Sequence, residues 1–346
     1  MNVNFAFLRH GYGCHNAMSN LVHNDVVSRS HALKFMKRGV ESKNILKGDI
    51  LPLNDPVLTN VGVEASIYNG CIVNKILRRL SNMYNGNKKL RMDTFNVVGC
   101  SPLIRCMETS YYMTRKWKNP PTKIYVFPLL REIDESSFDK YSEKSRETIR
   151  ITPSYSIKSI DEQKQYLQKL GILDFFDFSF VETFPRERIE PGDIKEFMNW
   201  FAKYFMTLLN TTNTNLNVFI TTHAGVLKDY SGEGFYNNSG FVINTTYVDN
   251  FSKNMYISLN NYIKEYDFFL NYSDPKYNSV KYYCPSDRCG QLCSVAKGSI
   301  NNLEKIGLTC NIEDDENNKQ QLPFKLQRKQ MKNISPLNLN TVWDFE

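Results

Sequence analysis

The chain has 346 residues, of which 41% are hydrophobic, so it is long and apolar enough to bury one large core. Its 43 basic and 36 acidic residues leave a formal net charge of +7, which suits an anionic substrate and gives little support for nucleic-acid binding. It has no basic leader with a long apolar stretch and no run of eighteen apolar residues, so we expect a cytoplasmic protein without a membrane span.

The first predicted element is a strand over residues 3–8, which is largely apolar. Arg9 and His10 follow it directly. A neutral imidazole is a competent nucleophile toward phosphorus, and phosphoryl transfer also needs cations that gather the negative charge on the phosphoryl oxygens. An arginine and a histidine together at a strand end therefore indicate phosphoryl chemistry.

A second buried strand is predicted over residues 93–100. Ser101 and Pro102 after it are typical of a helix start, with the serine as N-cap and the proline at the first helical position. Arg105 is then expected one turn into this helix, whose free N–H groups favour an anion.

The remaining elements are a strand over 123–127 that leads to Glu132, an amphipathic helix over 193–209, and a strand over 218–222 that ends at His223. In open α/β sheets, ligands bind outside the carboxyl ends of the strands. The four predicted strand ends are therefore expected to converge on one site.

Five pieces of sequence stand in order along residues 1–262: Leu8-Arg9-His10-Gly11 with Asn16, Asp55-Pro-Val-Leu58-Thr59-Asn-Val-Gly62, Ser101-Pro-Leu-Ile-Arg105-Cys-Met-Glu-Thr109, Leu130-Arg-Glu132, and Thr222-His223-Ala-Gly225. Through them the chain resembles the histidine phosphatase superfamily, in the branch that contains cofactor-dependent phosphoglycerate mutases and small-molecule phosphatases. A weaker match is Asn238-Ser239 followed by alternating stretches at 241–248 and 255–262, like the family's closing hairpin.

The resemblance implies an α/β fold, a three-layer α/β/α sandwich around a mostly parallel sheet. It also implies that His10 is transiently phosphorylated and that Glu132 protonates the leaving oxygen and then, in a hydrolase, takes a proton from water. The expected phosphoryl-binding residues are Arg9, Arg105, His223 and, in an assisting role, Asn16. The scheme requires no metal or other cofactor, since guanidinium and imidazole groups do the work that magnesium does in kinases. We assign His15 and His23 structural roles.

Departures from the family's pattern bear on the reaction. The mutases carry a Ser/Thr-Gly-Trp turn after the assisting asparagine and an Arg-His-Tyr-Gly run after the acid, whereas residues 17–53 lack tryptophan and residues 133–136 read Ile-Asp-Glu-Ser. The sequence therefore favours hydrolysis of a phosphorylated small molecule. Two alternatives stay open: a mutase, and a catalytically silent phosphate-binding protein. The substrate and the oligomeric state are open as well.

The catalytic domain is expected to span residues 1–262, with a loop insertion at 18–54 and a cap at 134–191. Residues 263–346 form a C-terminal extension that ends in a polar tail. Four cysteines of this extension could hold a structural zinc, but their spacing lacks the usual two-residue knuckle, and buried thiols are the alternative. These residues are Cys284, Cys289, Cys293 and Cys310.

Overall fold

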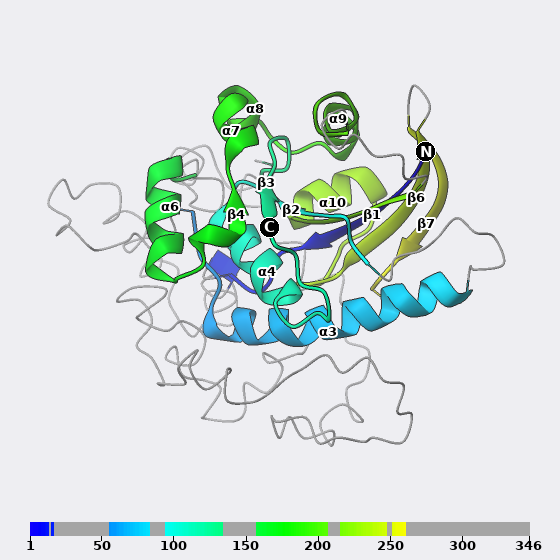
Figure 1. The fold of residues 1–346 in the computed structure, drawn as a ribbon, viewed down its shortest axis with the longest axis horizontal. Helices are drawn as coiled ribbons and strands as arrows, with labels where there is room; N and C mark the ends of the chain where they lie inside the picture. The colour runs from blue at the N-terminus through cyan, green and yellow to red at the C-terminus, as the bar shows by residue number, and fades with distance from the viewer. Residues whose placement is uncertain are drawn as a thin grey trace, which may run out of the picture.

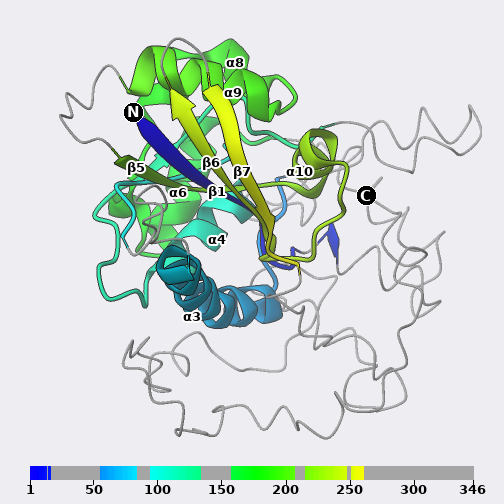
Figure 2. The same cartoon turned by 90° about the vertical axis from the view of Figure 1, so that its right-hand side faces the viewer.

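The computed structural model describes residues 1–13, 15–16, 55–83, 94–133, 157–206, 215–247 and 251–260. The predicted insertion at 18–54, the first part of the predicted cap, the boundary at 262 and the four cysteines of the C-terminal extension lie outside the described residues. What is described forms an α/β fold with helices on both faces of one sheet, so the predicted three-layer architecture is confirmed (Figures 1 and 2).

In the described part of the chain the sheet has seven strands, in the order β4-β3-β2-β5-β1-β6-β7. The first five strands in this order are mutually parallel. They are β4 (Phe176–Asp177), β3 (Ile124–Val126), β2 (Val97–Cys100), β5 (Asn215–Thr222) and β1 (Asn2–Arg9). β6 (Gly240–Tyr247) and β7 (Phe251–Ser258) complete the sheet as the antiparallel hairpin that the sequence predicts.

Helices cover both faces of this sheet. α3 (Asn60–Met83), α4 (Ile104–Thr114) and α6 (Ile160–Lys169) lie on one face, and α9 (Ile194–Trp200) and α10 (Ala224–Ser231) lie on the other. Shorter helices, η2 (Leu173–Phe175), α7 (Ser179–Thr183) and α8 (Pro185–Ile189), lead from α6 to α9. Within the described residues, no helix combines the length and the apolar character that crossing a membrane needs.

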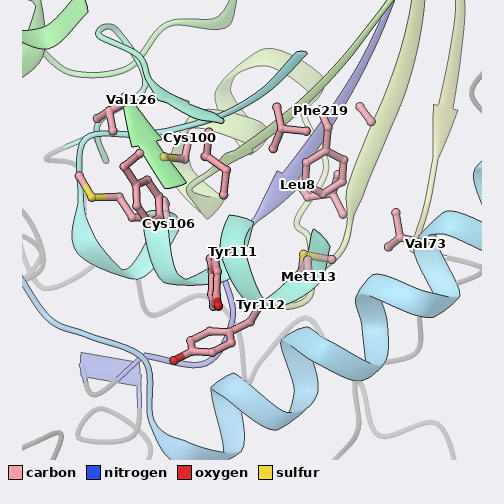
Figure 3. Close-up of a cluster of buried hydrophobic side chains, with 14 of the residues drawn as sticks. Leu8, Val73, Cys100, Cys106, Tyr111, Tyr112, Met113, Val126 and Phe219 are labelled. Carbon is pink, nitrogen blue, oxygen red and sulfur yellow. The ribbon is translucent and has the colours of Figure 1, made fainter. Parts of the chain in front are cut away.

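The two faces of the sheet bury separate apolar cores because successive side chains of a strand point to opposite sides. In β1, Phe5 and Phe7 pack toward α9, whereas Ala6 and Leu8 pack toward α3 and α4. Figure 3 shows Leu8 in the second of these cores, together with Val73 of α3 and Tyr111 of α4. Burial of both faces explains why the parallel strands read as nearly continuous apolar runs.

The helix predicted over 193–209 changes character halfway. Its regular part, α9, is capped by the Asp193 side chain, which accepts hydrogen bonds from the N–H groups of Lys195 and Glu196. It then passes into a wider π-helical turn, η3 (Phe201–Phe205). The rings of Phe201 and Phe205 stack there with centroids 4.8 Å apart, so this turn belongs to the aromatic core.

The described part of the predicted cap, residues 157–191, is built into the sheet and its layers. β4 pairs with β3 and places Phe176 in the core, and α6 adds the fully buried Leu167. A reciprocal capping box between Ser159 and Glu162 starts α6. The apolar side chains of these residues therefore extend the domain's own core.

Buried asparagines cross the sheet in one row. Asn4 of β1 donates to the Asn217 side chain of β5 at 2.8 Å, and the Asn244 side chain of β6 donates to Asn4 at 2.5 Å. The three residues are register partners, and Asn217 also donates to the carbonyl of Thr94 at 2.7 Å. Because a one-residue slip turns every side chain to the other face, these amide contacts hold β1 in register with both of its neighbours.

Asn4→Ala should lower the free energy of unfolding by about 2–4 kcal/mol, since it removes two hydrogen bonds between buried amide side chains. Urea denaturation of the wild type and the variant measures this difference. Asn2→Ala is the matched control on the same strand, because Asn2 is only partly buried and accepts one hydrogen bond, from Thr246. Equal stabilities for Asn4→Ala and the wild type would contradict the role of the row.

Candidate active site

Two histidines leave neighbouring parallel strands at the same edge of the sheet. Arg9 at the end of β1 is paired in register with Thr222 at the end of β5, so His10 and His223 are the next residue on each strand. The His10 N–H donates to the Thr222 carbonyl at 2.9 Å, and the two imidazole ring centroids lie 5.2 Å apart. Both rings are fully buried. The convergence expected from the sequence is therefore present for this pair.

The His10 ring is fixed in one tautomer by its own loop. Its Nδ1 lies 2.7 Å from the Gly11 carbonyl oxygen, and a carbonyl only accepts, so Nδ1 carries the proton. Nε2 then holds the lone pair, and no side-chain or backbone group of the described residues hydrogen-bonds to it. Burial, followed by the nearby Arg105 and Arg9 guanidinium groups, holds the pKa of His10 well below its ordinary value. The ring is thus a neutral base with its lone pair available.

A loop near the C-terminal end of the described residues makes hydrogen bonds to the residues at the end of β1. The Arg9 N–H donates to the Ser239 carbonyl at 2.7 Å, and the Arg9 guanidinium donates to the Phe235 carbonyl at 2.8 Å. The Asn237 side chain donates to the His10 carbonyl at 3.0 Å. Asn238 has a positive φ of 61° and donates its N–H to the Arg9 carbonyl. This loop, residues 235–239, fixes the backbone that carries His10.

The segment after His10 is held by the start of α3. Thr59 bonds to the Tyr12 carbonyl through both its N–H and its hydroxyl, at 3.0 Å each, and its hydroxyl also accepts from the Gly62 N–H. A Cβ on Gly62 would lie 2.1 Å from the Tyr12 carbonyl oxygen, so only glycine permits this approach. The spacing of Leu58-Thr59 and Gly62 in the second motif therefore serves to fix the loop that follows His10.

Arg105 reaches the site from α4, where it is the second helical residue. Its Nη2 lies 3.1 Å from His223 Nδ1. Thr109, one turn farther along, accepts from the Gly11 N–H at 2.9 Å and donates to the Arg105 carbonyl at 2.6 Å. The third motif thus joins the helix that bears the Arg105 guanidinium to the loop that follows His10.

His223 has a defined tautomer as well. A guanidinium only donates, so Nδ1 accepts from Arg105 and Nε2 carries the proton. Nε2 lies 2.7 Å from the Ser101 hydroxyl. Burial and then the charge of Arg105 hold the pKa of His223 well below its ordinary value, with smaller effects from His10, His15 and Arg131.

The predicted N-cap role of Ser101 is wrong. α4 begins at Ile104, its N-cap residue is Leu103, and this cap has no side-chain hydrogen bond. Asp55 serves this end instead, since its Oδ1 accepts from the Ile104 N–H at 2.9 Å. Ser101 lies directly after β2, and its hydroxyl lies 2.7 Å from His223 Nε2 and also accepts a longer hydrogen bond from the Leu103 N–H, at 3.4 Å. Arg105 accordingly lies in the first turn of the helix, closer to its start than expected.

A buried polar cluster behind this helix end supports Asp55. Its Oδ2 accepts from the Gln163 side chain at 2.6 Å and from the Lys158 N–H at 3.3 Å, and the Arg188 side chain donates to Gln163 at 3.1 Å. Burial raises the pKa of Asp55, while the charge of Lys158 and the Gln163 hydrogen bond oppose that shift. Residues of the predicted cap region thereby brace the helix that carries Arg105.

Glu132 enters the site from the segment after β3. The Thr222 hydroxyl donates to the Leu130 carbonyl at 3.0 Å, which ties this segment to the end of β5. The Glu132 carboxylate is buried, with Oε2 3.7 Å from His223 Nδ1. A Cβ on Gly225 would lie 2.6 Å from Glu132 Oε1, so the glycine of the last motif makes room for the carboxylate.

The structure thus gathers four of the six predicted site residues into direct proximity: His10, Arg105, Glu132 and His223. Arg9 acts on the pKa of His10 through its charge. The Asn16 side chain accepts from the Gly13 N–H at 3.0 Å, which fixes the loop after His10.

Sequence reasoning missed one neighbour of His10. The sequence predicts only a structural role for His15, yet its ring lies 5.4 Å from that of His10, centroid to centroid. Its closeness follows from the tight fold of residues 11–13, whose Gly13 would clash with the His15 ring if it carried a Cβ. The glycines at 11 and 13 are the sequence signal for this fold.

The same side chains form a donor set that a metal ion could use, since ligand atoms of His10, Glu132 and His223 lie within 4.8 Å of one another. However, His223 Nδ1 already accepts from Arg105. The positive charges of Arg105 and Arg9 also oppose added positive charge on His10. The charges around this set therefore favour an anion over a cation.

Comparison with known proteins finds no family model and no curated protein that matches the sequence. Similar solved structures include the ecdysone phosphate phosphatase of Bombix mori in complex with tungstate, at 16% identity and a TM-score of 0.38 over 73% of this chain and 92% of that one. Another is a mutant phosphoserine phosphatase of Entamoeba histolytica in complex with phosphoserine, at 12% identity and a TM-score of 0.29 over 73% of this chain and 96% of that one. Both scores and both identities are low, so the function proposed below rests on the geometry of the site.

The buried neutral histidines make stability depend on pH. Unfolded histidine binds a proton below its ordinary pKa of 6.5, whereas folded His10 resists protonation, so acidification below this value favours the unfolded state. One such group contributes a slope of up to about 1.4 kcal/mol per pH unit. The free energy of unfolding should therefore fall between about pH 6.5 and about pH 5, and less steeply in His10→Asn. Urea denaturation across this pH range measures both slopes, and identical slopes would contradict the buried neutral state of His10.

Proposed function

We propose that this protein is a phosphomonoesterase of the histidine phosphatase type, which hydrolyses a phosphorylated small molecule through a phosphohistidine on His10. The observation that carries the proposal is the orientation of the His10 ring. Its protonated Nδ1 is held by the Gly11 carbonyl, and Nε2 keeps its lone pair, in a ring that feels the charge of Arg105 and lies 5.2 Å, centroid to centroid, from that of His223. This is the state in which an imidazole attacks phosphorus.

In the first step, the Nε2 lone pair of His10 forms the N–P bond while the bond between phosphorus and the ester oxygen breaks. Glu132, in its protonated form, gives its proton to the departing alkoxide oxygen, which leaves as an alcohol. In the second step, the Glu132 carboxylate takes a proton from water, whose oxygen attacks phosphorus. The N–P bond breaks, inorganic phosphate forms, and the lone pair returns to His10.

The reaction also needs cations that stabilise the negative charge of the phosphoryl oxygens, and the site has them. Arg105 is fully buried and close enough to lower the pKa of His10, and Arg9 adds a second guanidinium. His223 is the third phosphoryl-binding group in the proposal, with Asn16 assisting. The scheme uses no metal ion, because guanidinium groups take the place of the cation.

Simple assays distinguish the proposed phosphatase from the two alternatives, a mutase and a silent phosphate-binding protein. A phosphoglycerate mutase would interconvert phosphoglycerates, whereas the proposed phosphatase releases inorganic phosphate. A silent phosphate-binding protein would bind phosphate and form no phosphorylated histidine. A screen of sugar phosphates, phosphoglycerates, inositol phosphates, nucleotides and phosphopeptides, with inorganic phosphate as the readout, tests the proposal and narrows the substrate.

His10→Ala should abolish both turnover and the acid-labile labelling of the protein by a phosphorylated substrate, because it removes the attacking lone pair. Rapid quenching at alkaline pH followed by mass spectrometry measures the label. His15→Asn is the matched control, since His15 is one of two histidines whose rings lie against that of His10, and its replacement leaves the proposed nucleophile in place. A label that persists in His10→Ala would assign the nucleophile to another residue.

Glu132→Gln should slow hydrolysis of alkyl phosphates by about 10²- to 10⁴-fold, the usual contribution of one general acid. The loss should be much smaller for a nitrophenyl phosphate, because that leaving group hardly needs a proton. Steady-state rates with both esters measure the difference. Equal losses for the two esters would move the acid role away from Glu132.

A further inference from the structure

The hydroxyl of Ser101 makes the shortest polar contact of the second histidine. Its Oγ lies 2.7 Å from Nε2 of His223, and both side chains are fully buried. Ser101 is fixed at this place by its backbone, since its N–H donates to the carbonyl of Thr221 at 2.8 Å. The contact therefore belongs to the sheet edge itself, with one partner at the end of β2 and the other at the end of β5.

Without a phosphoryl group, the hydrogen-bond partners of His223 set its ring in one state. Nδ1 accepts from the Arg105 guanidinium, so Nε2 is the protonated nitrogen and donates to Ser101. In this state Nδ1, the nitrogen nearer Glu132, has no proton to give. A phosphoryl oxygen at the site is an acceptor and needs a donor there.

His223 must therefore change its protonation when a phosphoryl group binds. It can gain a proton at Nδ1 and become an imidazolium, or it can move its proton from Nε2 to Nδ1. A serine hydroxyl is suited to both states, because it accepts from Nε2–H in the imidazolium and donates to a bare Nε2 in the other tautomer. A backbone carbonyl at this place would allow only the first state.

The other groups that face His223 cannot serve as a partner that both accepts from and donates to Nε2. Arg105 only donates, and Glu132 and His10 are assigned to the reaction itself. The Cys106 thiol of α4 lies 3.4 Å from Nε2, and burial raises its pKa well above the ordinary value, so it remains a weakly bonding thiol. Arg131 adds positive charge that opposes protonation of the ring.

We propose that Ser101 is a positioning residue that keeps the His223 ring in place while its proton changes between the empty and the phosphoryl-bound site. This proposal rests on the proposed function. Ser101 acts through His223, and no contact between the serine and the phosphoryl group is required.

The test uses protein labelled with ¹⁵N at histidine, whose ring nitrogens report protonation directly, with the His223 signals assigned from a His223→Gln sample. In the wild type, Nε2 should be protonated and Nδ1 bare without ligand, and Nδ1 should gain a proton when inorganic phosphate is added. A bare Nδ1 in the phosphate complex, or a protonated Nδ1 without it, would overturn the proposal even before any variant is made.

Ser101→Ala should weaken binding of inorganic phosphate by about 10-fold or more, the effect of one hydrogen bond to a charged group. It should also shift the loss of the Nδ1 proton in the phosphate complex to lower pH, because the imidazolium has lost the acceptor of its Nε2–H. Ser101→Thr, which keeps the hydroxyl, should restore both. Ser110→Ala is the matched control, because it removes a buried hydroxyl of α4 that bonds to Thr221 and does not contact His223.

Unchanged phosphate affinity and unchanged His223 titration in Ser101→Ala would overturn the proposal, as would equal effects of Ser110→Ala. The proposed function fails in a different way. A wild type that binds phosphate and protonates His223 as expected, but releases no phosphate from any ester, would remove the phosphatase and leave the role of Ser101 standing.

Discussion

The parallel pairing of β1 with β5 is the constraint on which the site depends. It sets Arg9 opposite Thr222, so the next residue of each strand is a histidine at the same sheet edge. The row of buried amides keeps this register, since Asn4 bonds to partners on both neighbouring strands. A shift of one residue would turn the His10 side chain to the other face of the sheet and separate the pair. Fold and chemistry are thus linked through a single register.

Burial and charge then decide what the site accepts. The guanidinium of Arg105 and the rings of His10 and His223 are fully buried, and Arg9 is nearly so. Neutral rings beside buried cations lower the cost of taking up an anion, because the anion supplies the countercharge that the low-dielectric interior favours. The single negative charge of a Glu132 carboxylate is smaller than the two positive charges of Arg9 and Arg105. A phosphate dianion balances these two positive charges better.

Local patterns predicted the strands and the residues at their ends, because an apolar run that stops at a charged residue is read from neighbours in sequence. These local patterns gave wrong or missing predictions where a residue's partner is distant in the sequence. Ser101 before a proline has the local signature of an N-cap, yet Asp55 bonds the first residue of the helix and the shortest contact of the serine hydroxyl is with His223. The placement of residues 157–191 in the sheet depends on pairing of the two-residue strand β4, which is too short for any periodicity to show.

The clamp formed by residues 235–239 has a consequence for the order of events during synthesis. β1 is the first strand of the chain, but its two neighbours, β5 and β6, are among the last elements of the described domain. Until residues 215–247 leave the ribosome, β1 has neither partner, and the carbonyls that hold Arg9 have yet to be made. β1 is therefore translated long before its partners, so a nascent chain that stops short of β6 carries His10 without the contacts that position it.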